Sequence, residues 1–329
     1  MKFKMPPEWA SHQRMLMEWP VPDTGWRENI GKACRAFAGV ACAIREFEPV
    51  TMIVNPDDAQ LAADLCGQGI DIVVQEHDDC WMRDNGCTFV IDQENSVLHG
   101  VHWDFNAWGR KYPHFELDRH IPSFLCDYYN IPEYKAPIIL EGGSIHTNGN
   151  GTLLTTAQCL LNQNRNPQLT EDQISSVLCS TLGVARVIYI PEGLDGDETD
   201  GHVDNIACFL DENTVLIPYT DNRGDANYES LSKPRQTVEA AGFSVRNIVQ
   251  PPLTLEKGVP LTLSYVNFVF VNGGIVMPGF GEELEEYDKL AKSQLQSIFP
   301  DRKIVQVMTR DIIRGGGNIH CITQQMPAV

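Results

Sequence analysis

The chain has 329 residues, enough to bury a large hydrophobic core in one or two domains. Its formal net charge of −19 argues against binding to nucleic acid or to an anionic membrane, because both require a basic surface. The charge is compatible with a cationic substrate, although solubility alone would also account for it.

The first residues lack the apolar region of a signal peptide, and no uninterrupted apolar run is long enough to span a bilayer. The ten cysteines are scattered without a closely spaced pair, which favours reduced thiols over a disulfide framework. We therefore expect a soluble protein of the cytoplasm.

Helical and strand-like segments alternate along the chain. Helices are expected at residues 27–47, 57–67, 115–130, 170–182, 227–242 and 283–299, and Thr170 and Gln173 have the spacing of a capping box. Short apolar runs rich in β-branched residues, expected to be strands, lie at 50–54, 70–74, 88–91, 138–140, 152–155, 186–190, 206–210, 214–217, 245–249, 266–271, 275–277 and 304–307. This alternation predicts an α/β fold, and the absence of a linker predicts one domain over residues 1–329.

Two short motifs each occur twice. Residues 142–146 (GGSIH) match residues 316–320 (GGNIH) at four of five positions. Asp84-Asn85 followed by Phe89 has the same spacing as Asp204-Asn205 followed by Phe209. The repetition favours a ring of related β/α modules whose equivalent positions meet at a central axis. Such a ring would place Asp84 and Asp204 on opposite sides of one pocket, with Cys321 entering from another module.

Cys321 is the candidate nucleophile. An arbitrary cysteine is usually an inert buried hydrophobe, but this one follows Gly315, Gly316 and Gly317, which permit close backbone approach to a ligand. A phosphate-binding loop is the competing interpretation of the glycines, and neither a Walker motif nor GxGxxG accompanies them.

His202 is the candidate base, because its neighbour Asp204 would share its face if this segment were extended. An exposed polar turn is the alternative for this segment. His320 is beside Cys321 in sequence, but adjacent strand residues face opposite ways, so we expect the base to come from elsewhere.

Two acidic segments are candidate cation sites. Trp81 offers an aromatic face and Asp84 a bidentate acceptor, although local composition slightly favours a solvated loop there. Glu198 and Asp200 belong to an acidic run before His202, which is either a surface turn or a site for a positive charge at the far end of a substrate. A metal site at His77, Cys80 and Cys87 fits no zinc spacing, so we predict no metal there.

Longer motifs then carry a resemblance over nearly the whole chain. They include WMRD at 81–84, WDFNAWG at 103–109, LEGGSIH at 140–146, LNQNRNP at 161–167, TDGHVD at 199–204 and GGNIHCITQQ at 316–325. In these motifs the chain resembles agmatine deiminases of the Porphyromonas-type peptidyl-arginine deiminase family, in the guanidine-modifying superfamily.

The resemblance implies a five-fold pseudo-symmetric α/β propeller of ββαβ modules (the pentein fold). It also implies cofactor-free hydrolysis of agmatine to N-carbamoylputrescine and ammonia by a homo-oligomer. We expect the reaction to pass through a thiouronium intermediate on Cys321 and to serve putrescine biosynthesis, with amine salvage as the alternative use. By resemblance, Cys321, His202, Asp84 and Asp204 fall on catalytic positions. Glu198 and Gly316 fall near substrate-contacting positions, and we add Trp81 and Asp200 as candidate substrate contacts.

Three alternatives remain open from the residues. A Cys–His amidase or peptidase would use Cys321 without needing two carboxylates around the reacting carbon. A non-catalytic protein that binds a cationic amine would need no thiol. Free arginine or peptidyl-arginine competes with agmatine as the substrate, since Arg83 and Arg165 lie within the motifs and Arg110 directly follows one.

Overall fold

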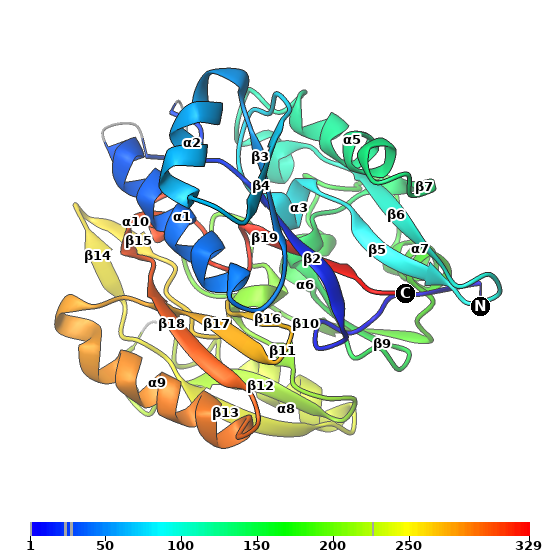
Figure 1. The fold of residues 1–329 in the computed structure, drawn as a ribbon. Helices are drawn as coiled ribbons and strands as arrows, with labels where there is room; N and C mark the ends of the chain where they lie inside the picture. Colours follow the sequence, from blue (N-terminus) through cyan, green and yellow to red (C-terminus); the bar gives the residue numbers. More distant parts are fainter. Residues whose placement is uncertain (1, 23–24, 27–28, 226) are drawn as a thin grey trace.

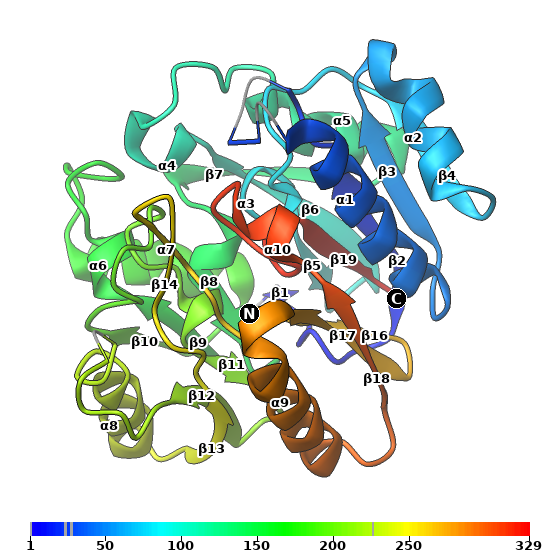
Figure 2. The same ribbon diagram turned by 90° about the vertical axis from the view of Figure 1, so that its left-hand side faces the viewer.

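The computed structural model describes residues 2–22, 25–26, 29–225 and 227–329. Within them, the strands form five sheets of three or four strands and one separate two-stranded hairpin. Figure 1 shows these sheets as small units spread through the molecule with helices packed outside them. In the turned view of Figure 2 the sheets surround a central region, and helices α1, α5, α8 and α9 lie at the periphery.

Each sheet repeats one strand pattern. A first strand pairs antiparallel with a second, and the second pairs parallel with a third that follows a helical connection. The strands of four successive units are β5 (Thr88–Asp92), β6 (Val97–Asp104) and β7 (Glu133–Ile139); β8 (Ile145–Thr147), β9 (Thr152–Thr156) and β10 (Arg186–Ile190); β11 (Cys208–Phe209), β12 (Thr214–Tyr219) and β13 (Ser244–Val249); and β16 (Val269–Val271), β17 (Gly274–Gly279) and β18 (Lys303–Met308).

The fifth unit joins the two ends of the chain. Its first strand is β19 (Thr323–Pro327), which pairs antiparallel with β2 (His12–Glu18), and β2 pairs parallel with β3 (Val50–Val54). Strand β4 (Ile70–Val74) extends this sheet, and β1 (Phe3–Lys4) is added to the edge of β5. The predicted propeller of ββαβ modules is thus the observed architecture, closed by strands from opposite ends of the sequence.

The helices present apolar faces to the sheets. The longer ones are α1 (Ile30–Arg45), α2 (Ala59–Cys66), α5 (Ile121–Tyr128), α7 (Glu171–Leu182), α8 (Ser232–Ala240) and α9 (Glu285–Ile298). In α1 the buried side chains recur at helical spacing, for example at Ala33, Phe37 and Val40. Across the described residues, no helix is both long and apolar enough to cross a bilayer.

The predicted capping box is confirmed at the start of α7. The backbone N–H of Gln173 donates to Oγ1 of Thr170 at 3.3 Å, and the backbone N–H of Thr170 donates to Oε1 of Gln173 at 2.9 Å. These two bonds satisfy amide groups that the first turn of a helix otherwise leaves unpaired.

The predicted helices and strands are largely present, with shorter helix ends. The helix expected at 27–47 is α1, whose predicted residues 27–28 lie outside the described residues. The strand expected at 206–210 is confined to β11, because Ile206 ends the preceding short helix η5 (Val203–Asn205) and Leu210 lies in the bend that follows β11. Strands β2, β6, β8 and β19 were not expected, nor was the hairpin of β14 (Thr254–Glu256) and β15 (Val259–Leu261).

Every unit carries a polar segment directly before its first strand. Helix α3 (Met82–Asn85) precedes β5, helix η4 (Gly142–Ser144) precedes β8, and η5 precedes β11. Asn267 precedes β16, and a turn over residues 319–322 precedes β19. Because the units are arranged around one axis, these five segments meet at the centre and form the site.

Candidate active site

The pocket at this centre is lined by residues from several units and their connections. Its walls are aromatic, acidic and glycine-rich. The lining residues are Trp81, Asp84, Trp108, Tyr112, Glu198, Thr199, His202, Asn205, Gly315, Gly316, Gly317 and Cys321. Apart from His202, none of these described lining residues is basic, so the pocket presents a negative potential to a ligand.

Cys321 lies at the base of the pocket and is 6% exposed. Its Sγ accepts a hydrogen bond from Nδ2 of Asn267 at 3.2 Å and lies 3.5 Å from Oδ2 of Asp204. Burial raises the pKa of the Cys321 thiol well above its ordinary value, and the charges of Asp204 and Asp84 raise it further. The thiol is therefore protonated in the empty pocket, as expected for a thiol beside two carboxylates.

His202 lies between two carboxylates. Its Nδ1 is 3.7 Å from Oδ1 of Asp84, and its Nε2 is 3.8 Å from Oε2 of Glu141. Burial alone would lower the pKa of His202, but the charge of Asp84 and contacts with Cys159 and Glu141 raise it well above its usual range. The imidazole is therefore protonated at neutral pH and can serve as an acid.

Gly143 marks the point where three of these groups converge. A methyl group on its Cα would lie 2.7 Å from Oδ1 of Asp84, 2.7 Å from Nδ1 of His202 and 3.1 Å from Oδ2 of Asp204. Its backbone N–H also donates to Oδ1 of Asp84 at 3.0 Å. Asp84 and Asp204 therefore face a common space, as the repeated motif predicts, and a residue without a side chain is required between them.

Asp84 is fully enclosed rather than part of a solvated loop. It lies in α3 with 4% of its surface exposed, and Nε1 of Trp108 donates to its Oδ2 at 2.9 Å. Burial raises the pKa of Asp84 to about 6, against the opposing charge of His202. The solvated-loop interpretation is wrong, because Trp81 and Asp84 are buried and line the axial pocket.

An unusual backbone turn holds Trp108 in place. Ala107, Trp108, Gly109 and Arg110 all have positive φ, of 52°, 53°, 90° and 62°. A left-handed conformation costs a residue other than glycine of order 1 kcal/mol, so tertiary contacts must maintain this turn. A methyl group on Gly109 would lie 2.3 Å from Nδ2 of Asn164, which accounts for the glycine.

Asp204 is linked to His320 beneath Cys321. Its Oδ2 is 2.9 Å from Nδ1 of His320, and Nε2 of His320 is 2.8 Å from Oε1 of Glu8. Although burial opposes it, the hydrogen bond and charge of His320 lower the pKa of Asp204, which is therefore ionised. His320 and Cys321 lie in a turn rather than a strand, so the argument that neighbouring strand residues face opposite ways does not apply to them. The imidazole of His320 contacts Asp204.

The extended conformation expected for residues 202–204 is also corrected. His202 precedes the 3-10 helix η5, and a single turn of this helix carries Asp204 toward His320 and Cys321. His202 and Asp204 reach the same pocket by this turn and not by strand alternation. The interpretation of an exposed polar turn is wrong too, since both residues are buried.

Each glycine of the Gly315–Gly316–Gly317 run faces a different wall residue. A methyl group would lie 2.2 Å from Cζ2 of Trp26 at Gly315, 2.0 Å from Oε1 of Glu198 at Gly316, and 2.3 Å from Cζ3 of Trp81 at Gly317. Gly316 also has φ of +109°. The run therefore brings bare backbone against the pocket walls.

The two predicted acids of the run before His202 have different surroundings. Glu198 lines the pocket, and the hydroxyl of Tyr112 donates to its Oε2 at 3.0 Å. Asp200 is paired with Lys111 at 2.8 Å, bonded by Nδ2 of Asn164 at 3.0 Å and in contact with Arg165. Asp200 is outside the pocket lining, and its oxygens already have partners.

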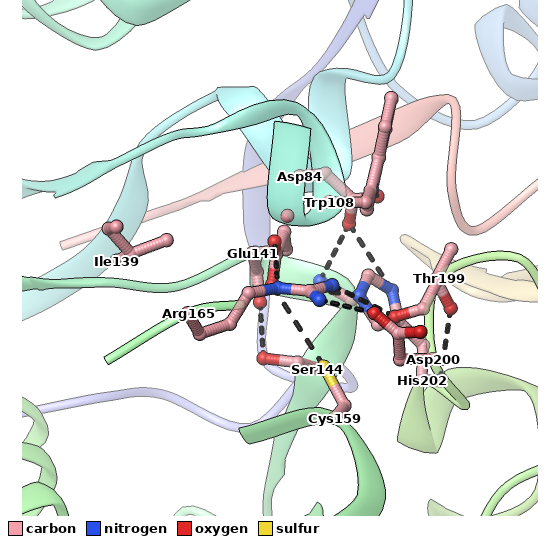
Figure 3. A network of polar contacts seen from close by, with 12 residues as sticks. Asp84, Trp108, Ile139, Glu141, Ser144, Cys159, Arg165, Thr199, Asp200 and His202 are labelled. Atoms are coloured by element: carbon pink, nitrogen blue, oxygen red, sulfur yellow. Dashed lines mark hydrogen bonds and ion pairs between the residues drawn. The ribbon is translucent and has the colours of Figure 1, made fainter. Parts of the chain in front are cut away.

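Glu141 and Arg165 form a layer behind His202 that was not among the sequence candidates (Figure 3). Nε of Arg165 donates to Oε1 of Glu141 at 2.8 Å, and neither side chain is exposed. Despite burial, the charge of Arg165 lowers the pKa of Glu141, so a carboxylate stands behind the imidazole. The sequence signal was the glutamate directly before the repeated GGSIH segment.

The fold is a ring of five α/β units, and its acidic axial pocket presents a thiol, an imidazole and two carboxylates. This combination of fold and site is the one implied by the resemblance of the sequence motifs. The family described as Porphyromonas-type peptidyl-arginine deiminase matches residues 4–327. The chain belongs to this family.

Curated and solved relatives agree with this assignment. The agmatine deiminase of Stutzerimonas stutzeri (strain A1501) is 42% identical over 356 aligned residues, covering 99% of this chain and 96% of the relative. The structure of the agmatine deiminase of Enterococcus faecalis has a TM-score of 0.92 at 34% identity, covering 99% of this chain and 96% of the other. A substrate-bound variant of C. jejuni agmatine deiminase has a TM-score of 0.92 at 28% identity, with the same coverage.

Proposed function

We propose that this chain hydrolyses agmatine to N-carbamoylputrescine and ammonia. The observation that carries the proposal is the convergence of Asp84, His202 and Asp204 at Gly143, beside Cys321. Two carboxylates that face a common space suit a planar guanidinium, which donates paired N–H bonds. The relatives named as agmatine deiminases support the same reaction.

The pocket favours agmatine over arginine because of what lies at its far end. The α-carboxylate of arginine would need a cation, whereas the amine of agmatine needs an acceptor. Glu198 supplies the acceptor, with its carboxylate oriented by the hydroxyl of Tyr112. The guanidinium of Arg83 faces Glu8 and Gln325 instead, and that of Arg165 is committed to Glu141 and Asp200.

Substrate binding prepares the thiol for attack. The guanidinium of the substrate replaces the solvation that burial removes from the Cys321 thiolate. It also balances the charges of Asp84 and Asp204, which oppose ionisation of Cys321 in the empty pocket. Binding therefore lowers the pKa of the Cys321 thiol relative to the free enzyme, and the thiol loses its proton to solvent. The thiolate then adds to the central carbon of the guanidinium, forming a C–S bond.

His202 supplies and then removes a proton. As imidazolium it protonates one amino nitrogen of the adduct, the C–N bond breaks, ammonia leaves, and a thiouronium remains on Cys321. The neutral imidazole next takes a proton from a water that attacks the same carbon. Collapse of this second adduct breaks the C–S bond, its hydroxyl proton passes to the departing sulfur, and N-carbamoylputrescine and the Cys321 thiol are released. The carboxylate of Glu141, 3.8 Å from Nε2 of His202, stabilises the imidazolium by its charge.

The test is ammonia release by purified protein from agmatine, arginine and a blocked arginyl peptide, measured side by side with chelator present. Strong preference for agmatine is the expected result. Preference for arginine or peptide would retain the thiol chemistry and refute the role given to Glu198. No ammonia from any of the three would favour the amidase or amine-binding alternative.

The product indicates the place of the reaction in metabolism. Hydrolysis of the carbamoyl group of N-carbamoylputrescine gives putrescine, so the reaction is a step of putrescine biosynthesis. We also propose a homo-oligomer in the cytoplasm, which light scattering and cell fractionation would test. A monomer at working concentration would contradict the first of these.

A further inference from the structure

Three buried side chains meet on the face of His202 that is turned away from the pocket. Glu141 precedes η4, Cys159 lies in α6 (Ala157–Leu160), and His202 precedes η5. Each offers one ligand atom, Oε2, Sγ or Nε2, and the three atoms lie within 4.8 Å of one another. Figure 3 shows them close together with Arg165 on the same carboxylate.

The separations are too long for good hydrogen bonds. Oε2 of Glu141 is 3.8 Å from Nε2 of His202 and 4.0 Å from Sγ of Cys159, and Nε2 of His202 is buried without a hydrogen-bond partner. An unpaired buried group of this kind is destabilising. A polar atom of His202 therefore points into a space walled by a thiol and a carboxylate.

These separations suit a metal ion better. Zinc bonds of about 2.0–2.3 Å in tetrahedral geometry place ligand atoms roughly 3.3–3.7 Å apart, so a contraction of about 1 Å or less would close the cluster around an ion. Sulfur, nitrogen and oxygen ligands together are typical of zinc rather than of magnesium or calcium. Arg165 occupies Oε1 of Glu141 and leaves Oε2 free, while Asp200 offsets the charge of the guanidinium.

We propose that Glu141, Cys159 and His202 form an inhibitory site for Zn²⁺ or another thiophilic divalent cation. Binding displaces the proton of the Cys159 thiol and one proton of the His202 imidazolium, and both go to solvent. With the ion on Nε2, the ring no longer becomes an imidazolium that protonates the leaving nitrogen. The inhibition rests on the proposed function, whereas the binding of the ion does not.

Cobalt provides a direct test on the full chain. After treatment with chelator and its removal, one equivalent of Co²⁺ should produce a thiolate-to-cobalt charge-transfer absorption. The absorption should persist in Cys321→Ser, which removes the pocket thiol, and disappear in Cys159→Ala and Cys159→Ser. Cys34→Ala is the matched control, because Cys34 is a buried cysteine within helix α1 and should affect neither the spectrum nor turnover.

Turnover tests the inhibitory role separately. Zn²⁺ should inhibit agmatine hydrolysis by wild-type protein, chelator should reverse the inhibition, and Cys159→Ala should need about ten- to a hundredfold more Zn²⁺. Thermal unfolding shows whether the Cys159 variants are folded, and Cys159→Ser is used if Cys159→Ala is not folded. Inhibition is expressed relative to each variant's own turnover in chelator.

The outcomes separate the two proposals. Absorption that is absent from wild type, retained in both Cys159 variants or lost in Cys321→Ser would overturn the metal site. Zn²⁺ that binds through Cys159 without affecting turnover would overturn the inhibition. If wild-type protein shows no agmatine turnover in chelator, the proposed function fails, and the cobalt spectrum still decides the site.

Discussion

Gly143→Ala tests the site without removing any functional group. The new methyl would lie 2.7 Å from Oδ1 of Asp84 and from Nδ1 of His202, whereas ordinary contact begins at 3.4 Å. Each group must therefore retreat by at least about 0.7 Å, or the backbone must shift by as much, as for an overpacked core. Misplacement on the scale of 1 Å can cost about a hundredfold in rate, equal to ~2.7 kcal/mol of transition-state stabilisation.

The assay is kcat/KM for ammonia release from agmatine, with the folded fraction measured by thermal unfolding. Gly39→Ala in helix α1 is the matched control, since its methyl would meet Cγ1 of Val307 at 3.9 Å. The control should retain full activity and gain about 0.5–1 kcal/mol of stability. A Gly143→Ala protein that is folded and has wild-type kcat/KM would refute the convergence of groups at this point.

Three further predictions concern the same pocket. Asp84→Asn should reduce kcat/KM by at least about a hundredfold, because charged hydrogen bonds of roughly 1.5–3 kcal/mol each are weakened; near-normal turnover would favour the amidase alternative. In wild type, Asp84 binds the guanidinium as a carboxylate, and its pKa is about 6, so kcat/KM should fall about tenfold per pH unit below that value; a flat profile down to pH 5 would contradict this. Cys321 should react slowly with iodoacetamide at pH 7 and faster with a cationic haloacetamidine, as followed by peptide mass spectrometry, because its free thiol is protonated; the reverse order would contradict the raised pKa.

Strands and helices that bury a single apolar face or a continuous apolar run could be predicted from the sequence. Strand β19 could not, because Gln324 and Gln325 make its sequence polar. Both glutamines are buried, and Oε1 of Gln325 accepts a hydrogen bond from Nη2 of Arg83, 242 positions earlier in the chain. A partner so distant leaves no local signal, so the closure of the ring by β2 and β19 could not be predicted from periodicity.

The repeated motifs predicted the candidate site better than local amino-acid composition did. Repeated Asp-Asn and Gly-Gly motifs correctly indicated that Asp84, Asp204 and Cys321 meet at one axis. Local composition misassigned Asp84 to a solvated loop, because three acids, an arginine and a tryptophan resemble a surface segment. Only the tertiary structure buries this segment in α3 and places Trp108 on its carboxylate.

The residues behind the pocket were not predicted from the sequence, although Glu141 directly precedes the repeated GGSIH segment. Glu141 and Glu8 are far in sequence from the histidines that they contact, His202 and His320. An isolated glutamate carries no sign of burial or of its partner, and only the fold brings it to an imidazole. The strand argument about His320 failed for a similar reason, because a turn replaces the expected strand at Cys321.

Mass spectrometry of a rapidly quenched reaction with agmatine tests the central claim most directly. The account predicts a covalent adduct on the peptide that contains Cys321, with the mass of the thiouronium formed after loss of ammonia, which appears during turnover and disappears when substrate is exhausted. The adduct and turnover should both be absent from Cys321→Ala, which should still bind agmatine. Full turnover by Cys321→Ala would contradict covalent catalysis by this thiol.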